Sequence, residues 1–457
     1  MTAHSFDVVV LGGGSGGYAA ALRAAELGRS VALIEKDKVG GTCLHRGCIP
    51  TKALLHAAEV ADHTRNAADV GVKATFEGID MAGVTAYREG IVAKKFKGLE
   101  GLVKARDITT VAGAGRLGAD RTVRVGDDTY RGEHVVLATG SYSRSLPGLE
   151  IGGRIITSEQ ALALTDVPER VVVLGGGVIG VEFASVWSSF GADVTIVEAL
   201  PHLVPNEDEA MSKALERAFR KRGIAYRLGV RFQSATQTDE SISVTLEDDT
   251  VLEADQLLVA VGRGPATADL GFEEAGVHLD RGFVVVDERL RTGVPGVWAV
   301  GDIVPGLQLA HRGFQQGIFV AEEIAGLDPV VVPDRDIPKI TYCSPEVASV
   351  GLTEAGAVEE HGADAVVSYE YNLAGNGRSE ILGTGGLVKV VRRKDGPIVG
   401  LHLIGDRMGE LITEGQLAVV WEAHPEDIAP FIHAHPTQSE ALGEAFLALA
   451  GKPLHTI

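Results

Sequence analysis

The chain has 457 residues, which is enough for about three domains of ~100–200 residues each. Its formal net charge of -20 argues against nucleic acid or an anionic membrane surface as the main partner, and its 3 cysteines exclude a disulfide scaffold. The N-terminus "MTAHSFDVVV" lacks the basic and apolar segments of a signal peptide, and no apolar run is long enough to span a membrane. We therefore expect a cytoplasmic protein without a membrane or nucleic-acid partner.

The N-terminal segment carries the pattern of a dinucleotide-binding unit. Residues 6–11, "FDVVVL", predict a short buried strand, and "GGGSGG" and the helix-like "YAAALRAAELG" follow it. Gly12, Gly14 and Gly17 form a G-x-G-x-x-G motif, which allows a tight turn, a close approach of a pyrophosphate and close packing of helix on strand. A second strand, "SVALIE", ends in Glu35, where a carboxylate can accept hydrogen bonds from a ribose diol. Strand, helix and acid together predict nucleotide binding rather than a glycine turn that serves packing alone.

The same arrangement returns in "RVVVLGGGVIGVEFASVWSSFGADVTIVE", with Gly175, Gly177 and Gly180 in the motif and Glu198 at the end of the second strand. In both units the acid follows the first glycine by 23 residues. Two units imply two cofactors, for which we expect a tightly held FAD and a diffusible nicotinamide nucleotide. Glu198 would repel a 2′-phosphate, and the following "ALPHL" offers no arginine to bind one, so NAD is favoured over NADP.

The rest of the chain predicts further α/β structure. Residues 50–105 show helical spacing of apolar positions, whereas residues 108–140 and 256–265 resemble short strands that end at glycines. The buried strand "VWAVGD" ends in Asp302, which either lies at a ligand crevice or caps the next segment. From about residue 336 strands alternate with a helix, "GELITEGQLAVVWEAH". The predicted fold is α/β, with two Rossmann-like dinucleotide-binding domains followed by an α+β domain.

Two cysteines lie close together in "GGTCLHRGCIPTK". On an ideal helix Cys43 and Cys48 would be separated by about 7.5 Å of rise, so a disulfide between them needs a distorted backbone, which Gly47 permits. A thiol at a helix N-terminus is stabilised as the reactive thiolate. Two buried structural thiols are the alternative, but the spacing, the glycines and the neighbouring nucleotide unit favour a redox pair. Cys343 has no such neighbours and is expected to be structural. No metal site is predicted.

A second chemical group lies in "HAHPTQSEALGEA" near the C-terminus. Exchange with a dithiol substrate proceeds through a thiolate, so it needs a base that titrates near neutrality, as histidine does. Glu440 follows His435 by five residues and could hydrogen-bond its second ring nitrogen and fix the tautomer. We therefore favour His435 over His433 as the catalytic base.

The motifs together resemble one known family. "GGTCLHRGCIPTK", "ATGS", "GVIGVE", "VGRGP", "AVGD", "LAH" and "HAHPTQSE" occur in the order found in flavoprotein disulfide reductases, and the resemblance spans residues 6–445. Within that family, "HAHPT" is most similar to the dihydrolipoamide dehydrogenases. The resemblance implies an FAD-binding domain over residues 1–145 that resumes at 266–335, an NAD-binding domain over 146–265 and a dimerisation domain over 336–457.

The resemblance also implies which residues hold the cofactors. FAD is expected to contact Gly12, Gly14, Gly17, Glu35, Thr42, Lys52, Gly115, Thr139, Gly140, Ser141, Asp302, Leu309, Ala310 and His311. NAD is expected to contact Gly175, Gly177, Gly180, Glu182, Glu198 and Gly262.

The catalytic roles follow from the same resemblance. Cys43 is expected to exchange with the substrate sulfur, while Cys48 faces the flavin as the charge-transfer thiolate. Lys52 and Glu182 are expected to pair near the flavin. The family forms homodimers in which His435 and Glu440 of one subunit complete the site around Cys43 of the other. The expected substrates are the lipoyl domains of 2-oxo acid dehydrogenase complexes or of the glycine cleavage system.

Some positions depart from common family usage, and other functions remain open. His45 and Arg46 stand where an uncharged pair is more frequent, and Gln316 stands where an acid is frequent. The alternative is an NAD(P)H-dependent quinone or disulfide reductase (diaphorase) of the same fold, which could dispense with the dithiol. A glutathione reductase would need arginines after the second glycine motif to bind NADPH, and a mercuric reductase would need a C-terminal cysteine pair. The sequence shows neither feature, so both functions are disfavoured. A non-catalytic, flavin-bound redox sensor is the candidate from a different class.

Overall fold

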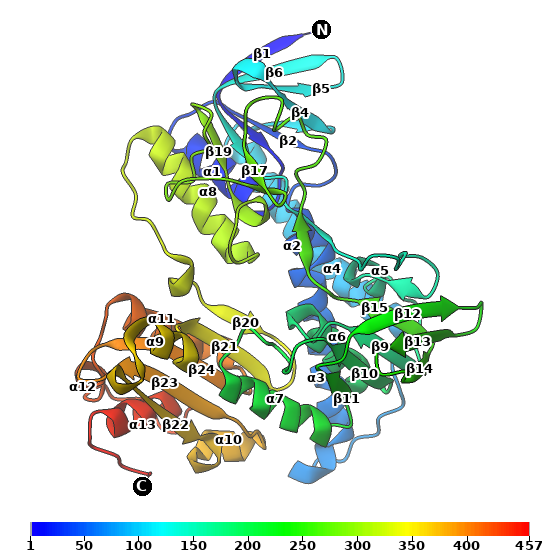
Figure 1. Cartoon of the computed structure of the whole chain (residues 1–457), viewed down its shortest axis with the longest axis vertical. Helices are drawn as coiled ribbons and strands as arrows, with labels where there is room; N and C mark the ends of the chain where they lie inside the picture. Colours follow the sequence, from blue (N-terminus) through cyan, green and yellow to red (C-terminus); the bar gives the residue numbers. More distant parts are fainter. Residues whose placement is uncertain (1, 457) are drawn as a thin grey trace.

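The computed structural model describes residues 2–456. Three sheet-based parts make up the chain, with the N-terminal part at the top of Figure 1 and the other two side by side below it. Within residues 2–456, no helix combines the length and the apolar character that crossing a membrane would need.

The N-terminal part is built on a sheet with β1 at its centre. Its strands are β1 (Ala3–Leu11), β2 (Val31–Glu35), β3 (Thr109–Ala112), β4 (Gly115–Gly118), β5 (Thr122–Val125), β6 (Asp128–Leu137) and β19 (Val297–Ala299), in the order β3-β2-β1-β6-β5-β4 with β19 against β6. β1 runs parallel to both neighbours, and Val8, Val9 and Val10 are all buried, as expected for a parallel sheet covered on both faces. Because β19 joins it, the chain returns to this sheet after the second nucleotide unit.

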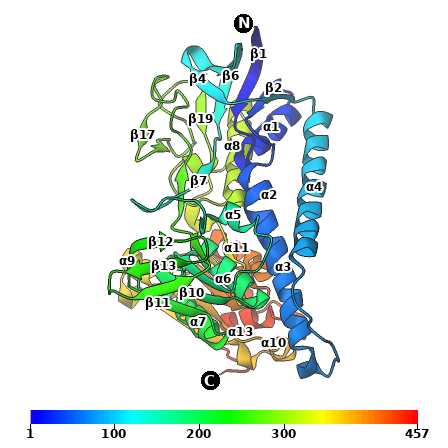
Figure 2. The same cartoon turned by 90° about the vertical axis from the view of Figure 1, so that its right-hand side faces the viewer.

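Helices cover this sheet and extend away from it. α1 (Ser15–Glu26) packs closely against α8 (Ala310–Ala325), and a glycine stripe on α8 allows the contact, since a Cβ on Gly317 would lie 2.2 Å from the Gly16 carbonyl oxygen. The long helices α3 (Cys48–Arg65) and α4 (Met81–Ala105) run side by side along the molecule in Figure 2.

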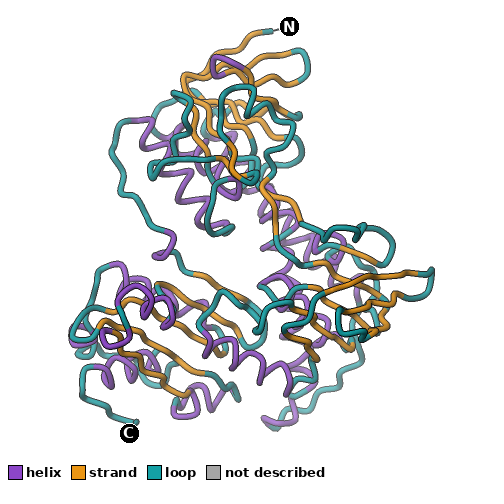
Figure 3. The backbone as a smooth tube through the Cα atoms, in the orientation of Figure 1, coloured by secondary structure: helices purple, strands orange, loops and turns teal. Residues whose placement is uncertain are grey.

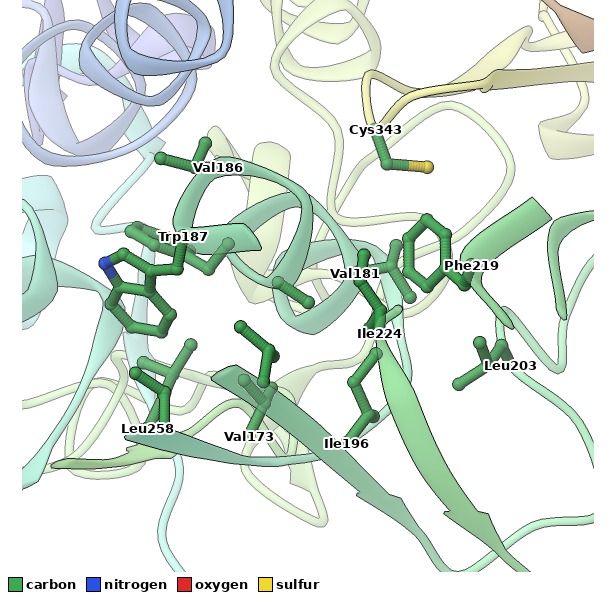
Figure 4. Close-up of a cluster of buried hydrophobic side chains, with 14 of the residues drawn as sticks. Val173, Val181, Val186, Trp187, Ile196, Leu203, Phe219, Ile224, Leu258 and Cys343 are labelled. Carbon is green, nitrogen blue, oxygen red and sulfur yellow. The ribbon is translucent and has the colours of Figure 1, made fainter. Parts of the chain in front are cut away.

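The second part repeats the arrangement on a smaller parallel sheet. Its strands are β8 (Ile155–Ile156), β9 (Arg170–Leu174), β10 (Asp193–Glu198), β11 (Ala225–Leu228) and β15 (Gln256–Val259), in the order β11-β10-β9-β15-β8. The same part contains the helices α6 (Val178–Phe190) and α7 (Glu209–Lys221). It also contains a small antiparallel sheet of β12 (Phe232–Gln237), β13 (Ile242–Leu246) and β14 (Val251–Ala254). Figure 4 shows its core, to which Trp187, Ile196 and Phe219 contribute. Cys343 of the third part also belongs to this core.

The third part, which we call the interface part, is an antiparallel sheet. Its strands are β20 (Lys339–Thr341), β21 (Glu346–Gly351), β22 (Val366–Asn372), β23 (Leu387–Arg393) and β24 (Ile398–Gly405), in the order β20-β21-β24-β23-β22. Side chains alternate between its faces: Val347 and Ile404 pack on the core of the second part, whereas Ala348 and Leu403 pack on the opposite side. α9 (Glu354–His361), α11 (Met408–Val420), α12 (Pro425–Ile428) and α13 (Glu440–Leu449) belong to this part.

Short elements and loops complete the chain. They include α2 (Gly41–Arg46), α5 (Ser158–Ala161), α10 (Gly377–Leu382), β7 (Ser141–Ser143), β16 (Arg263–Pro265), β17 (Leu279–Asp280) and β18 (Phe283–Val284). Figure 3 shows that the connection from α8 to the interface part is mostly loop, with one short 3-10 turn at Asp334–Asp336. The α/β fold with two dinucleotide units and a following α+β part is thus confirmed.

Candidate active site

A cavity of about 1230 Å³ runs between the two nucleotide units. Single-ligand pockets usually measure about 300–1,000 Å³, so this cavity is large enough for more than one ligand. Residues singled out from the sequence that line it are Gly14, Thr42, Cys43, Cys48, Lys52, Gly140, Ser141, Gly175, Gly177, Glu182, Glu198, Gly262, Asp302, Leu309, Ala310 and His311. Expected residues that lie outside this lining, all within the described part of the chain, are Gly12, Gly17, Glu35, Gly115, Thr139, Gly180, His435 and Glu440.

The three glycines of the first motif have different surroundings. A Cβ on Gly12 would lie 2.2 Å from the Ala138 carbonyl oxygen, and a Cβ on Gly17 would lie 1.8 Å from the Gly12 carbonyl oxygen. A Cβ on Gly14 would meet nothing within 4 Å, and this glycine faces the cavity at the N-terminus of α1. The outer two glycines therefore close the turn, while the middle one leaves backbone space for a phosphate.

The second motif repeats this division. Cβ atoms on Gly175 and Gly180 would collide with backbone oxygens at 2.4 and 1.9 Å, whereas one on Gly177 would meet nothing within 4 Å. Gly177 precedes α6 and lines the cavity. Both turns therefore fit a dinucleotide pyrophosphate.

The two strand-end acids are held in the same way. Glu35 accepts hydrogen bonds from the Gly13 N–H at 2.6 Å and the Asp37 N–H at 2.9 Å. Glu198 accepts them from the Gly176 N–H at 2.6 Å and the Leu200 N–H at 2.8 Å. Each carboxylate is thus fixed against its glycine turn.

An arginine that the sequence analysis missed lies on the same wall as Glu198. Arg231 of the segment that enters β12 lines the cavity, 33 positions after Glu198 in the numbering. The segment after β10 indeed holds no arginine on this lining, but the hairpin supplies one from further along the chain. Only the tertiary fold brings it there, so no local spacing could have revealed it.

The two thiols lie at a break between helices. α2 ends at Arg46, Gly47 takes a non-helical conformation (φ -141°, ψ -110°), and Cys48 begins α3. This is the kind of backbone distortion that a disulfide between Cys43 and Cys48 needs. Both thiols are free, partly buried and on the cavity lining.

The environment of the thiols favours one thiolate. A hydrogen bond from the Cys43 thiol lowers the pKa of Cys48 to about 7; burial opposes this effect and the charge of Lys52 supports it. The same hydrogen bond and burial raise the pKa of Cys43. In the dithiol form Cys48 is therefore the thiol that loses its proton first, and Cys43 keeps its proton.

Lys52 joins all three parts of the chain. Its Nζ lies 2.9 and 2.8 Å from the two carboxylate oxygens of Glu182 on α6. Glu182 also accepts a hydrogen bond from the Tyr342 N–H at 2.9 Å, and the Tyr342 ring lies 4.8 Å from the Lys52 ammonium. Burial works against the ammonium, but the Glu182 carboxylate raises the pKa of Lys52. Tyr342 was not singled out from the sequence, because it lies in no spacing pattern.

A polar cluster lies at the end of β19. The Ser141 hydroxyl donates to Asp302 at 2.5 Å and accepts from Arg263 Nε at 2.7 Å. Gln316, the departure noted above, accepts a hydrogen bond from the Gly301 N–H at 2.7 Å. Asp302 therefore faces the cavity, and Gln316 holds the backbone beside it.

His45 and Arg46, the two residues beside the thiols that depart from common family usage, point in different directions. The His45 ring bonds to the Val39 carbonyl oxygen at 2.9 Å and packs edge-on against Phe96 of α4. Arg46 lines the cavity and lies 3.1 Å from Asp37. His45 thus joins helices, whereas Arg46 adds positive charge to the cavity wall.

Two expected FAD contacts serve the surrounding structure. The Thr139 hydroxyl donates to the Ala266 carbonyl oxygen at 2.6 Å, which links the two passages of the chain. Gly115 is packed inside the sheet, where a Cβ would lie 2.6 Å from the Leu11 side chain.

His435 and Glu440 form a pair away from the cavity. His435 Nδ1 lies 2.9 Å from Glu440 Oε1, and the His435 side chain is 80% exposed. Burial acts to raise the pKa of Glu440, but the hydrogen bonds from the Thr437 N–H and the His435 ring outweigh it and lower this pKa. His433 instead pairs with Glu414 at 2.8 Å. Within one chain, the structure does not bring His435 to the thiols.

Three large apolar side chains of the interface part are exposed, and two of them shortly precede His435 in the chain. Trp421, Phe431 and Ile432 of the interface part are 74%, 69% and 97% exposed.

Comparison with known proteins places these features in one family. Residues 6–317 match the pyridine nucleotide-disulphide oxidoreductase family, and residues 337–446 match the dimerisation domain of the same family. The chain is 39% identical to the mitochondrial dihydrolipoyl dehydrogenase of Pisum sativum, covering 98% of this chain and 92% of that one. It is 38% identical to a dihydrolipoyl dehydrogenase of Bacillus subtilis, covering 99% of this chain and 100% of that one.

Solved structures agree. LpdA from Mycobacterium tuberculosis superposes with a TM-score of 0.90 at 27% identity, covering 98% of this chain and 100% of that one. The flavoprotein disulfide reductase RclA from Escherichia coli, in a Cu(II) complex, gives a TM-score of 0.88 at 28% identity, over 97% and 99% of the two chains. This chain therefore belongs to the pyridine nucleotide-disulphide oxidoreductase family and carries its dimerisation domain.

Proposed function

We propose that the chain is a dihydrolipoyl dehydrogenase, which oxidises protein-bound dihydrolipoyl groups to lipoyl groups and reduces NAD⁺ to NADH. FAD and NAD are its cofactors, as in the dihydrolipoyl dehydrogenases to which it is similar along nearly its whole length. The observation that carries the proposal is the Cys43 and Cys48 pair on the wall of one cavity that both dinucleotide turns also line.

The thiol chemistry can be assigned to individual sulfur atoms. A substrate thiolate attacks Cys43 of the oxidised pair, forms a mixed disulfide and releases Cys48 as a thiolate. The second substrate thiol then displaces Cys43, which closes the cyclic lipoyl disulfide and leaves both enzyme sulfurs reduced. The low pKa of Cys48 makes it the better leaving group, and the raised pKa of Cys43 keeps the proton there. Bound FAD supplies the path by which this electron pair reaches NAD⁺.

Lys52 and Glu182 are proposed to stabilise the leaving thiolate. Lys52 lies one helical turn after Cys48 on α3, so the ammonium and the sulfur share a helix face. Glu182 fixes the ammonium from the second part of the chain. The pair thus places a positive charge beside the thiolate and holds that charge in position.

The base for the substrate thiols is proposed to come from a second copy of the chain. His435 is exposed, is oriented by Glu440 and shortly follows the exposed Phe431 and Ile432 in the chain. The dimerisation domain match over residues 337–446 supports pairing through this part. In such a dimer, His435 and Glu440 of one subunit would serve Cys43 of the other.

The substrate proposal includes the protein partners. Lipoyl domains of 2-oxo acid dehydrogenase complexes are the proposed partners, because the relatives act on dihydrolipoyl groups. The diaphorase alternative needs no substrate dithiol, so the thiols and His435 distinguish the two functions.

The test is a comparison of electron donors and acceptors with the purified FAD-loaded enzyme. Wild type should reduce NAD⁺ with dihydrolipoamide, and Cys43→Ser should abolish this reaction. NADH-dependent reduction of a quinone should survive in Cys43→Ser, because it bypasses the dithiol. An enzyme that reduces quinones but never oxidises dihydrolipoamide would establish the diaphorase alternative instead.

A further inference from the structure

A line of polar side chains crosses one face of the interface sheet. Lys339, Ser349, His402, Lys389 and Glu370 are successive register partners on β20, β21, β24, β23 and β22. Directly paired residues in an antiparallel sheet point to the same face. This face is the one that packs on the core of the second part. We call these five residues the polar row.

The central members of the row are deeply buried. Ser349 and His402 are 0% exposed, and Lys389 is 5% exposed. Polar groups at such positions need partners, because they have lost their hydrogen bonds to water. Val347 and Ile404 lie next to the row on the same face of the sheet, and both belong to the apolar core. The partners of the row therefore indicate what the row is for.

Lys389 and Ser349 both contact one segment of the second part. Two further contacts stay inside the interface part: Lys389 also pairs with Glu354 of α9, and the His402 ring bonds to the Leu352 carbonyl oxygen at 2.9 Å. Lys389 Nζ lies 2.9 Å from Asp208 Oδ1 and 2.7 Å from Glu354 Oε2. The Ser349 hydroxyl hydrogen-bonds to the Glu207 carboxylate. Asp208 is itself 2% exposed and caps α7 by accepting from the Ala210 N–H at 3.0 Å.

Lys339, at the end of the row, contacts the same segment. Its Nζ lies 3.2 Å from Glu207 Oε1 and donates to the Asn206 carbonyl oxygen at 3.2 Å. We call residues 204–208, the last part of the connection from β10 to α7, the strap. The polar row thus binds the strap at three successive residues.

The other end of the strap contacts the second glycine turn. The Val204 N–H donates to the Gly176 carbonyl oxygen at 2.8 Å, and Gly176 is the residue that Glu198 holds from its other side. Val204 has φ 43°, in the left-handed region that β-branched residues rarely adopt. Such a conformation persists only where the surroundings impose it. In Figure 4, Leu203, the residue before the strap, lies at the edge of the core near Phe219.

The middle of the strap forms part of the cavity wall. Pro205 and Asn206 line the cavity on the same stretch as Glu198 and Leu200. A shift of the strap would therefore move both this wall and the backbone of the glycine turn.

We propose that the polar row is a positioning element for the dinucleotide site of the second part. Lys389 and Ser349, which lie off the cavity lining, hold the strap through Asp208 and Glu207 and so set the affinity of this site for NAD. The interface part thereby controls cofactor binding as well as subunit pairing. The inference rests on the proposed function, because it takes the second site to be the NAD site.

The experiment measures dinucleotide affinity in the FAD-loaded enzyme. Lys389→Met and Ser349→Ala are titrated with NAD⁺ and with ADP by calorimetry. We expect dissociation constants for both probes to rise about tenfold in Lys389→Met and about threefold in Ser349→Ala, since each loses a buried hydrogen bond to a charged group. Reduction of the enzyme by dihydrolipoamide without NAD⁺ should keep its wild-type rate, because the thiols lie in the other nucleotide unit.

Arg392→Met is the matched control. Arg392 is a buried cation on the same strand as Lys389, and it pairs with Glu426 at 2.8 Å, away from the strap. This variant should be destabilised in a similar way yet bind NAD⁺ like wild type. An equal loss of affinity in Arg392→Met, or wild-type affinity in folded Ser349→Ala, overturns the inference.

Two outcomes need separate interpretation. If Lys389→Met does not fold, Ser349→Ala and Lys339→Met decide the question by the same measurement. A wild-type enzyme that binds NAD⁺, with variants of unchanged affinity, overturns the positioning role alone. A wild-type enzyme that oxidises dihydrolipoamide but does not bind NAD⁺ overturns the proposed function and this inference together.

Discussion

Lys52 Nζ lies within 2.9 Å of both carboxylate oxygens of Glu182, although the two residues are 130 positions apart in the sequence. Lys52 belongs to the same helix as Cys48, and Glu182 belongs to the helix that follows the second glycine turn. The pair therefore joins the thiol site to the second nucleotide unit. Its charge acts on the sulfur beside it, since Lys52 is one of the groups that lower the pKa of Cys48.

Replacing Lys52 should make the Cys48 thiolate harder to form. The pKa of Cys48 is lowered to about 7, so above that pH the reactive thiolate predominates. Lys52→Met removes a positive charge, which raises this pKa and lowers the thiolate fraction at pH 7. Alkylation of Cys48 by iodoacetamide in the reduced protein, followed against pH by mass spectrometry, should show a higher midpoint and a slower rate at pH 7.

Glu59→Gln is the control for this prediction. Glu59 lies on the same helix and pairs with Arg407 at 2.7 Å instead of contacting the thiols. Its replacement should leave the alkylation midpoint where wild type has it. An unchanged midpoint in Lys52→Met would show that the ammonium does not act on Cys48.

Alanine should affect stability at the glycine that closes the turn, Gly17, and FAD uptake at the glycine that faces the cavity, Gly14. Gly17→Ala places a Cβ 1.8 Å from the Gly12 carbonyl oxygen, so overpacking should lower the free energy of unfolding by about 1–3 kcal/mol or more. Gly14→Ala meets nothing within 4 Å, so the stability of the apoprotein should change by less than about 0.5 kcal/mol while FAD uptake falls. Thermal unfolding of the apoprotein and the flavin content after reconstitution separate the two effects. Equal destabilisation by both substitutions would contradict this division of roles.

The charge of Glu198 should decide between NAD and NADP. Glu198→Gln keeps an oxygen that can accept from the Gly176 N–H but removes the charge that repels a 2′-phosphate. Because Arg231 lines the same wall, kcat/KM for NADP⁺ should rise relative to NAD⁺ by about tenfold. Adding Arg231→Met should reverse this gain. If the double variant retains it, the arginine plays no part in the preference.

Mixing two inactive proteins tests the shared active site. Cys43→Ser and His435→Gln are combined under conditions that exchange subunits. In a mixed dimer one site carries both defects and the other carries neither, so activity should return toward about half of the wild-type value per mixed dimer. Cys43→Ser mixed with Cys48→Ser is the control, because both thiols serve the same site and every site stays defective. Confirmed subunit exchange without recovery in the first mixture would place His435 outside the shared site.

The local sequence determined the parts of this protein that neighbouring residues build. A β-branched run, three glycines, a helical pattern and a strand-end acid specify a strand–turn–helix–strand unit, because every interaction in it lies within a short stretch of chain. Both units, at Gly12 to Glu35 and at Gly175 to Glu198, therefore followed from pattern alone. The spacing of Cys43 and Cys48 likewise required the helix break that occurs at Gly47.

Only the tertiary structure decided which distant residues share a site. Tyr342 reaches Lys52 and Lys389 reaches Asp208 because the interface part packs against the helices of the second part. Arg231 reaches the cavity wall because the chain returns to the end of β10, where the Val230 N–H donates to the Glu198 carbonyl oxygen. Register and packing set such contacts, and no periodicity along the chain records them. The sequence showed each of these residues as an ordinary polar side chain, and its surroundings are decided only when distant segments of the chain come together.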